Sequence, residues 1–326
     1  MSTLLVAGVE IDGRRGQSVL VRDGRIAAVG PAGAVAERTG EPCTIVDGDG
    51  GALVPGLHDH HVHLFALAAR GSSLWCGAPG VAGLDGLVEH LRRSCREGDG
   101  WVRAVGWDDA CASWPDRGTL DAAVPARPVR LQHRSGAAWV LNSAALDLVA
   151  PQAGEAWPAG TERDRRGVPT GRFFGSDAWL RDRIGMKAPS LREVGHRLAA
   201  RGITAVTDAT ATNGAADVAA LAAARARGEV PQHLVVMTAA GVDAPQCGEV
   251  TIGCVKLVVE EASPPALDDL VASIRAVHEA GRNVAVHAAD RVSLVLTVVA
   301  LEAAGAAAGD RVEHASVAPP ELLPRL

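Results

Sequence analysis

The segment richest in side chains that can do chemistry is 53–64, which reads L-V-P-G-L-H-D-H-H-V-H-L. It places four histidines and one aspartate within six residues, directly after an apolar run. Side chains alternate along an extended strand, so Asp59, His61 and His63 project to one face. Two imidazoles on one face can both reach a divalent ion at about 2.0–2.1 Å. We therefore expect His61 and His63 to be metal ligands, in preference to a surface cluster or hydrogen-bonded core histidines.

Three further candidates lie near the ends of later apolar segments. Lys256 is found in G-C-V-K-L-V-V-E, where a buried ammonium is costly unless it is modified or paired. His287 is found in N-V-A-V-H-A, and His314 in R-V-E-H-A. Each of these histidines taken alone is as often structural as functional. Because a (β/α) barrel builds its active site from the C-terminal ends of its strands, all of these residues together predict one site.

The segments that must position these residues alternate between strands and helices from Arg201 onward. Continuous apolar strands alternating with Ala-rich amphipathic helices predict a parallel sheet or (β/α) barrel. The predicted strands are 203–208, 233–238, 255–259, 283–287 and 311–314, and the predicted helices are 217–227, 267–280 and 292–304. We assign 55–69 and 201–326 to this barrel.

The rest of the chain has a different character. Residues 1–54 contain short β-type runs (4–9, 19–21, 25–29 and 44–46) separated by Asp-Gly turn signals, which predicts a small β unit. Residues 70–200 are rich in Gly, Pro, Trp and Arg and carry all seven tryptophans of the chain. We expect this stretch to be an irregular insertion, as a lid or subdomain, in which most tryptophans serve packing.

The order of the candidate residues is specific. D-x-H-x-H after an apolar strand, then a strand lysine, then two strand-end histidines, resembles the amidohydrolase superfamily. Further segments resemble the branch that contains the N-substituted formamide deformylases, and the resemblance covers nearly the whole chain. These segments are G-W-D (106–108), Q-H-R-S-G (132–136), L-N-S-A-A-L (141–146), G-V-P-T-G-R (167–172), G-I-T-A-V-T-D (202–208) and E-H-A-S-V-A-P-P (313–320).

The resemblance implies an α/β fold, a TIM-like (β/α) barrel of the metal-dependent hydrolase type with part of a small β-sandwich in residues 1–54. It also implies one or two divalent ions, usually zinc. By this analogy His61 and His63 hold one ion, His287 and His314 hold the second, and a carboxylated Lys256 bridges them. Two such ions activate a water for hydrolysis, so Lys256, His287 and His314 are the predicted catalytic residues.

The implied reaction is hydrolysis of a carbon–nitrogen bond other than a peptide bond, in an amide, formamide or cyclic amide. The predicted substrate is a small molecule, and Trp107, Asp108 and His133 are expected at the pocket rim. At Ala137 relatives in this branch often carry histidine. Two other readings remain open: an inactive fragment or pseudoenzyme that binds metal or ligand without turnover, and another reaction on the same site, such as ester hydrolysis or isomerisation.

The resemblance further implies a catalytic aspartate at the end of an eighth strand. Only six strand candidates are present, and twelve residues follow His314, in which Pro319-Pro320 predicts the start of a helix. We therefore expect about six of the eight barrel strands, in a truncated chain that is prone to aggregate and has little activity.

The composition limits the classes of binding partner and the cellular location that we expect. The net charge is −6, with no cluster of Lys or Arg, which argues against nucleic-acid binding. The apolar run 294–301 is too short to span a bilayer, and the N-terminus does not resemble a secretory signal, so we expect a cytoplasmic protein. The six cysteines form no C-x-x-C pair, which predicts neither a zinc knuckle nor a disulfide framework. The oligomeric state is open, a homo-oligomer included.

Overall fold

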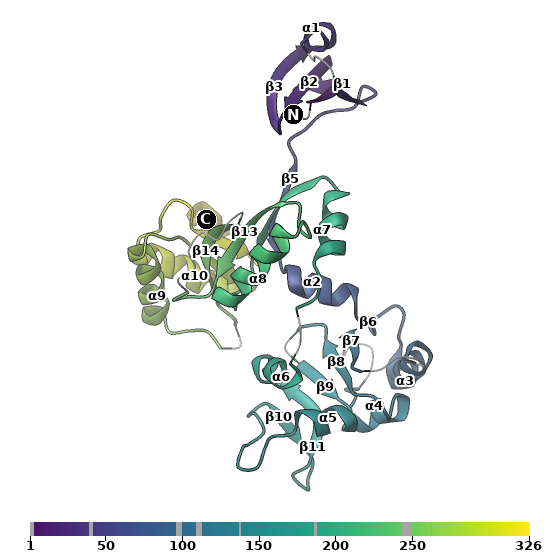
Figure 1. The fold of residues 1–326 in the computed structure, drawn as a ribbon. Helices are drawn as coiled ribbons and strands as arrows, with labels where there is room; N and C mark the ends of the chain where they lie inside the picture. Colours follow the sequence, from purple (N-terminus) through teal and green to yellow (C-terminus); the bar gives the residue numbers. More distant parts are fainter. Residues whose placement is uncertain are drawn as a thin grey trace. The chain divides into compact units, whose positions relative to one another are not determined.

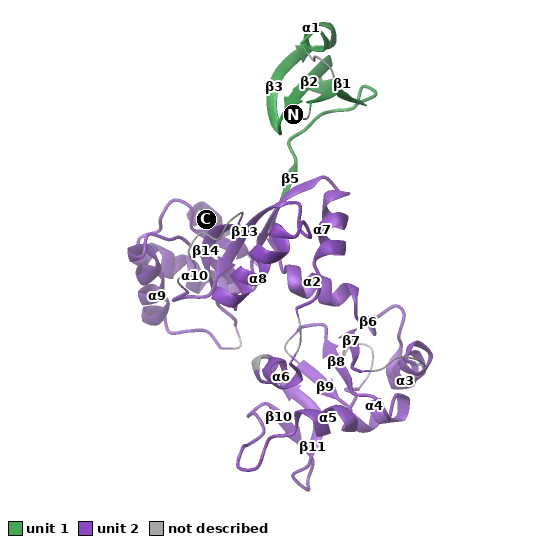
Figure 2. Ribbon diagram, in the orientation of Figure 1, with its two compact units in different colours: residues 1–58 green, residues 59–326 purple. Residues whose placement is uncertain are grey.

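The computed structural model describes residues 3–38, 42–95, 100–108, 113–136, 138–185, 188–242, 250–261 and 263–326 (Figure 1). The chain divides into two compact units, Met1–His58 and Asp59–Leu326 (Figure 2). The boundary thus falls a few residues after the expected end of the N-terminal β unit at Val54. Ala137 lies outside the described residues.

The first unit is a four-stranded sheet with the order β3-β2-β1-β4. Its antiparallel hairpins turn at Asp12-Gly13 and Asp23-Gly24, where all four residues have positive φ, as the two-residue turn with the hairpin's own twist requires. Leu5, Leu20 and Val35 form its small core. The elements are β1 (Thr3–Ile11), β2 (Arg14–Arg22), β3 (Arg25–Pro31), α1 (Ala32–Ala36) and β4 (Thr44–Asp47), so each of the four expected β runs is a strand.

The second unit contains a six-stranded sheet with the order β16-β15-β14-β13-β12-β5, in which the pairs from β12 to β16 are parallel. Helices follow the strands and pack against the sheet (Figure 1). The strands are β5 (Leu57–Val62), β12 (Ile203–Asp208), β13 (His233–Thr238), β14 (Val250–Val258), β15 (Val284–Ala288) and β16 (Arg311–His314). The helices are α2 (Leu64–Gly71), α7 (Arg192–Ala199), α8 (Ala215–Ala226), α9 (Leu267–Glu279) and α10 (Arg291–Ala304).

This sheet has the expected α/β character and the expected six strands, but it is not a closed barrel. The outermost strands, β5 and β16, share no ladder in the described residues. The sheet is nevertheless curled, because side chains of those two strands meet: Arg311 donates to the His60 carbonyl at 3.3 Å, and His61 contacts Glu313. The expected helix after Pro319 is a short 3-10 helix, Pro320–Arg325.

Residues 70–200 are not irregular, so that prediction was wrong. They form a second six-stranded sheet, mixed in direction, with the order β10-β11-β9-β8-β7-β6. Its strands are short and separated by Gly and Pro turns, which hides their periodicity in the sequence. The elements are β6 (Leu74–Trp75), α3 (Gly83–Ser94), β7 (Val102–Trp107), α4 (Arg117–Ala123), β8 (Val129–His133), β9 (Ala138–Leu141), α5 (Ser143–Val149), β10 (Thr161–Arg163), β11 (Pro169–Phe174) and α6 (Asp177–Ile184).

A fully buried asparagine joins the elements of this mixed sheet. The Asn142 side-chain oxygen accepts from the backbone N–H groups of Val129 at 2.8 Å and Ala145 at 3.0 Å, so it also caps α5. The side-chain nitrogen donates to the carbonyls of Val124 at 2.9 Å and Arg127 at 2.8 Å. All of its hydrogen-bonding capacity is therefore used by backbone groups, as a buried amide requires.

We expect Asn142→Ala to lower the free energy of unfolding by about 2–4 kcal/mol, because it removes a helix cap and leaves buried backbone groups without partners. Urea unfolding followed by circular dichroism measures the change. Leu148→Ala on the same helix is the control; that side chain is 62% exposed, so a change within about 0.5 kcal/mol is expected. Equal losses in the two variants would contradict the role given to Asn142.

Candidate metal centre

The curl of the parallel sheet brings four predicted histidines together. His61 lies on β5, His63 directly after it, His287 on β15 and His314 at the end of β16. The ring centroids of His61 and His63 are 5.2 Å apart, those of His61 and His314 are 4.6 Å apart, and those of His287 and His314 are 4.6 Å apart. The imidazoles therefore form one continuous group at the C-terminal ends of the strands.

The predicted lysine lies beside this group. Lys256 is on β14, the fourth strand of the sheet counted from β5, and only 5% of its surface is exposed. Its Nζ is 3.9 Å from an Oε atom of Glu313, and among the described residues it has no hydrogen-bond partner. A buried amine without a hydrogen bond is unusual, since burial penalises unsatisfied polar groups.

Glu313 is the functional residue that the sequence analysis missed. This buried carboxylate contacts His61 Nδ1, lies beside Lys256, and pairs with Arg311 Nη2 at 2.7 Å. It therefore joins the first, fourth and sixth strands. The available signal was its position: an acidic residue in a short strand directly before His314, on the face opposite to Val312.

Asp208 is a second carboxylate that the sequence analysis missed, and it supports the histidine cluster near His63. Asp208, at the end of β12, is 1% exposed and accepts from the backbone N–H of Leu64 at 2.8 Å and from Asn213 Nδ2 at 2.9 Å. It also accepts from the backbone N–H of Thr210 at 3.1 Å, whose hydroxyl is 3.0 Å from His63 Nδ1. Asp208 thus holds Leu64, which follows His63 in the chain, and Thr210, which contacts the His63 ring.

The Nδ1 atoms of the two histidines in the H-x-H segment are both engaged. Glu313 binds Nδ1 of His61, and the Thr210 hydroxyl binds Nδ1 of His63. Metal-binding histidines commonly have one ring nitrogen fixed in this way by a carboxylate or another polar group, which orients the second nitrogen. The Nε2 atoms of His61 and His63 are the ones left for a ligand.

Burial controls the protonation of the cluster. Desolvation lowers the pKa of His63, His287 and His314, so these imidazoles favour the neutral form that binds metals. Desolvation also lowers the pKa of Lys256, more than the neighbouring Glu313 raises it. Burial by itself would raise the pKa of Glu313, but the hydrogen bond from His61 and the nearby Lys256 outweigh it and the pKa is lowered.

The backbone at the end of β16 is strained. His314 and Ala315 have φ angles of 74° and 45°, in the left-handed region that non-glycine residues rarely adopt. The Ala315 N–H donates to the Ala288 carbonyl at 3.1 Å, which holds this turn against β15. Strain of this kind persists where surrounding contacts fix it, and it is concentrated at functional sites.

The donors present suit a divalent ion. Four imidazoles, a buried lysine and a carboxylate are the donor types that zinc sites use, once the lysine is carboxylated. In the described part of the chain, however, no three His, Cys, Asp or Glu side chains are already grouped as ligands of one ion.

The three predicted pocket residues form a separate group on the mixed sheet. Trp107 is 1% exposed and pairs in register with His133. His133 stacks on Trp114, with ring centroids 4.9 Å apart, and Asp108 forms an ion pair with Arg134 at 2.8 Å. The structure thus places these residues at the C-terminal ends of two adjacent strands of the mixed sheet, β7 and β8, and not on the strands of the histidine cluster.

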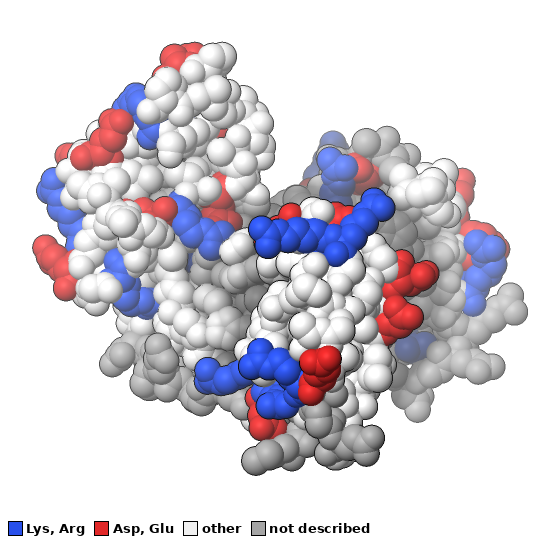
Figure 3. Space-filling view, turned by 90° about the horizontal axis from the view of Figure 1, so that it is seen from above, with Lys and Arg blue, Asp and Glu red and all other residues white. Residues whose placement is uncertain are grey.

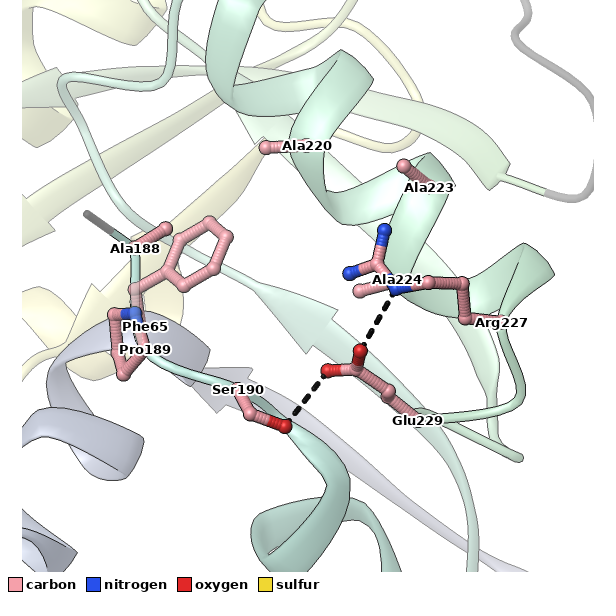
Figure 4. Close-up of a pocket in the computed structure, with 9 residues that line it drawn as sticks. All are labelled: Phe65, Ala188, Pro189, Ser190, Ala220, Ala223, Ala224, Arg227 and Glu229. Atoms are coloured by element: carbon pink, nitrogen blue, oxygen red, sulfur yellow. Dashed lines mark hydrogen bonds and ion pairs between the residues drawn. The ribbon is translucent and has the colours of Figure 1, made fainter.

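A pocket of about 300 Å³ has none of the clustered histidines in its lining (Figure 4). It is lined by alanines of α8 together with Phe65, Ser190, Arg227 and Glu229. Glu229 accepts from Ser190 Oγ at 3.0 Å and from Arg227 Nε at 2.8 Å. The charges of Glu229 and Arg227 therefore compensate each other within the pocket lining.

Charged side chains of both signs share the surface. On the face drawn in Figure 3, Lys and Arg side chains lie among Asp and Glu rather than in one continuous patch. No helix in the described ranges has both the length and the apolar character that crossing a membrane requires.

Comparisons with known proteins agree with the resemblance seen in the sequence. An N-substituted formamide deformylase from Arthrobacter pascens is 37% identical over 171 residues, which cover 50% of this chain and 32% of that protein. The matched stretch thus spans about a third of that relative's length. Uncharacterized metal-dependent hydrolases from Pyrococcus horikoshii OT3 and Pyrococcus furiosus share the fold, with TM-scores of 0.74 and 0.72. They are 19% and 20% identical, over 99% of this chain and 72% and 74% of theirs.

A model of the amidohydrolase family matches residues 44–326, which include both sheets of the second unit. This stretch contains every residue of the histidine and lysine cluster. The expected family is therefore confirmed, and the chain belongs to the amidohydrolase family.

Proposed function

We propose that this chain carries the metal site of a hydrolase that cleaves a carbon–nitrogen bond, other than a peptide bond, in a small molecule. The observation that carries the proposal is the meeting of His61, His287 and His314 from three separate strands. Family membership and the similarity to an N-substituted formamide deformylase support an amide, a formamide or a cyclic amide as the substrate.

The residues that would hold one or two divalent ions, preferably zinc, are His61, His63, His287, His314 and Lys256. When bound, such an ion lowers the pKa of a coordinated water toward 7 and polarises the scissile carbonyl. Carboxylation of Lys256 joins Nζ to the carbon of CO₂ and releases a proton, which replaces a costly buried ammonium by an anionic two-oxygen ligand. The lowered pKa of Lys256 favours the neutral amine that this step needs.

The chain's other residues have supporting roles in this proposal. Glu313 orients His61, and Thr210 orients His63, so that each presents Nε2. Trp107, Asp108 and His133 contribute to the substrate pocket from the segment 70–200, which serves as a lid or subdomain of the barrel segments 55–69 and 201–326. The curled sheet corresponds to part of a (β/α) barrel, and the sheet within 1–54 to part of a small β-sandwich.

A second candidate is a protein that binds metal or ligand without turnover. It would use the same clustered side chains as ligands and lack only the reaction. Metal content and turnover must therefore be measured separately, because the two candidates differ in turnover alone.

We expect the chain loaded with zinc and bicarbonate, then desalted, to retain one or two equivalents of zinc. The double variant His61→Ala, His63→Ala should lose at least one equivalent, because it removes both ligands from the first strand. Elemental analysis gives the content. His233→Ala is the control, since this exposed histidine of β13 lies outside the cluster and its loss should leave the zinc content unchanged. A parent chain without zinc would refute the site.

We expect the zinc-loaded chain to release an amine from at least one member of a panel of N-substituted formamides, linear amides and cyclic amides. His314→Ala should lower kcat/KM about 10²-fold or more, because a metal supplies several kcal/mol of transition-state stabilisation and 1.36 kcal/mol is tenfold in rate. Zinc binding without turnover on the whole panel would favour the second candidate, and turnover of esters alone would exclude C–N specificity.

We expect Glu313→Gln to weaken zinc binding about 10- to 100-fold, because the neutral amide no longer holds the His61 ring by a charged hydrogen bond. Competition with a chromophoric chelator gives the dissociation constant. Glu302→Gln, which changes an exposed carboxylate paired with Arg325, should leave it unchanged. An unaltered zinc affinity in Glu313→Gln would show that Glu313 does not position the ligand.

A further inference from the structure

Two arginines lie side by side on the mixed sheet. Arg103 of β7 and Arg130 of β8 are paired in register on parallel strands, so their side chains leave the same face. The opposite face carries Ala104 and Leu131, which belong to the apolar core of this sheet. Arg130 is only 6% exposed, whereas Arg103 is half-buried and borders solvent.

Neither arginine has a counter-charge among the described residues. The contact of Arg130 is with the Trp139 ring, whose centroid lies 5.2 Å from the guanidinium carbon. The Nε of Arg103 is buried and has no hydrogen-bond partner in the described structure. Burial lowers the pKa of both arginines, and for Arg130 burial and the like charge of Arg103 bring it to about 10.

Another arginine of the same sheet shows that this arrangement is not general. Arg172 of β11 pairs with Glu162 at 3.1 Å and donates to the carbonyls of Pro115 at 2.9 Å and Trp114 at 2.7 Å. Its charge and its donors are therefore matched within the chain. The Asp177 carboxylate accepts a hydrogen bond at 2.7 Å from the ring nitrogen of Trp139, the residue that Arg130 contacts.

We propose that Arg103 and Arg130 form a binding site for a small anion that carries a carboxylate or phosphate group. A buried cation without a partner is strongly unfavourable, and two neighbouring ones repel each other, so an anion between them removes both costs. The planar guanidinium groups match the oxygens of carboxylates and phosphates in bidentate hydrogen bonds. Trp139 contacts Arg130 by a cation–π interaction, and half-buried Arg103 is the one of the two arginines that solvent reaches more readily.

This site lies on a different sheet from the histidine cluster, and its test does not depend on the proposed metal site. It lies on β7 and β8 of the mixed sheet, whereas the histidines lie on β5, β15 and β16 of the parallel sheet. An anion bound there would belong to a substrate tail or to a separate ligand, and both sources present the same chemical group.

The test is a titration of the full chain, without added metal, with inorganic phosphate and separately with acetate. Ionic strength is held constant with KCl, and Tm is measured by differential scanning fluorimetry. A ligand that binds only the folded state raises Tm in a saturable way. We expect such a rise with at least one of the two anions, and a dissociation constant at least tenfold weaker in Arg130→Met, in which an uncharged side chain of similar length remains against Trp139.

Two controls keep the test specific. Arg134→Met, which changes a 65% exposed arginine already paired with Asp108, should respond like the parent. The double variant His61→Ala, His63→Ala should also respond like the parent; loss of the response there would place the anion at the histidines and overturn the proposal. That result would leave the zinc measurements unaffected, so the two proposals fail separately.

The proposal is overturned if neither anion raises Tm beyond the KCl control, or if Arg130→Met and Arg103→Met respond as the parent does. A response to phosphate alone, or to acetate alone, supports the site and names its ligand group. In buffer without either anion, Arg130→Met should be at least as stable as the parent, because it removes an unmatched buried charge. Should Arg130→Met fail to fold, the half-buried Arg103→Met decides by the same tenfold criterion.

Discussion

The curl of the parallel sheet is the constraint on which the candidate site depends. In a flat sheet of this strand order, β5 and β16 would lie five strand spacings apart, on the order of 24 Å. Instead, His61 of β5 contacts Glu313 and His314 of β16. The twist of successive parallel strands, maintained by the helices packed outside them, produces this approach. The histidine cluster is therefore a product of tertiary curvature and not of any one segment.

Low solvent exposure gives the cluster its chemistry. Lys256 and Glu313 are each 5% exposed, so their charges act in surroundings that water screens weakly. The same burial lowers the pKa of three histidines and keeps them in the form that donates a lone pair to a metal. Glu313 offsets part of the free-energy cost of burying these charges, because its one carboxylate interacts with His61, Lys256 and Arg311. Stability and site geometry thus rest on the same contacts.

The segment 70–200 packs around its own mixed sheet, which is separate from the parallel sheet. Its core is built from aliphatic side chains and Trp107 on one face, and from Phe173 with partly buried tryptophans on the other. Asn142 satisfies backbone groups where strands and helix meet, and Arg172 is matched in full. Arg103 and Arg130 differ from Arg172, because no described residue supplies a counter-charge to either of them.

The sequence by itself determined the local features. Strands 203–208, 233–238 and 311–314 have the expected bounds, because an apolar run closed by turn signals defines a buried strand locally. The residues with ligand chemistry, His61, His63, Lys256, His287 and His314, followed from their types and from the order typical of the family.

Only the tertiary structure decided which residues touch. Glu313 and His61 are 252 positions apart, and no periodicity reports such a contact. The same holds for Asp208 beneath Leu64, for the sheet within 70–200, whose strands are too short and interrupted to show alternation, and for the sheet that curls without closing. Local sequence fixes which face a side chain leaves, whereas contacts between distant strands depend on how the whole sheet twists.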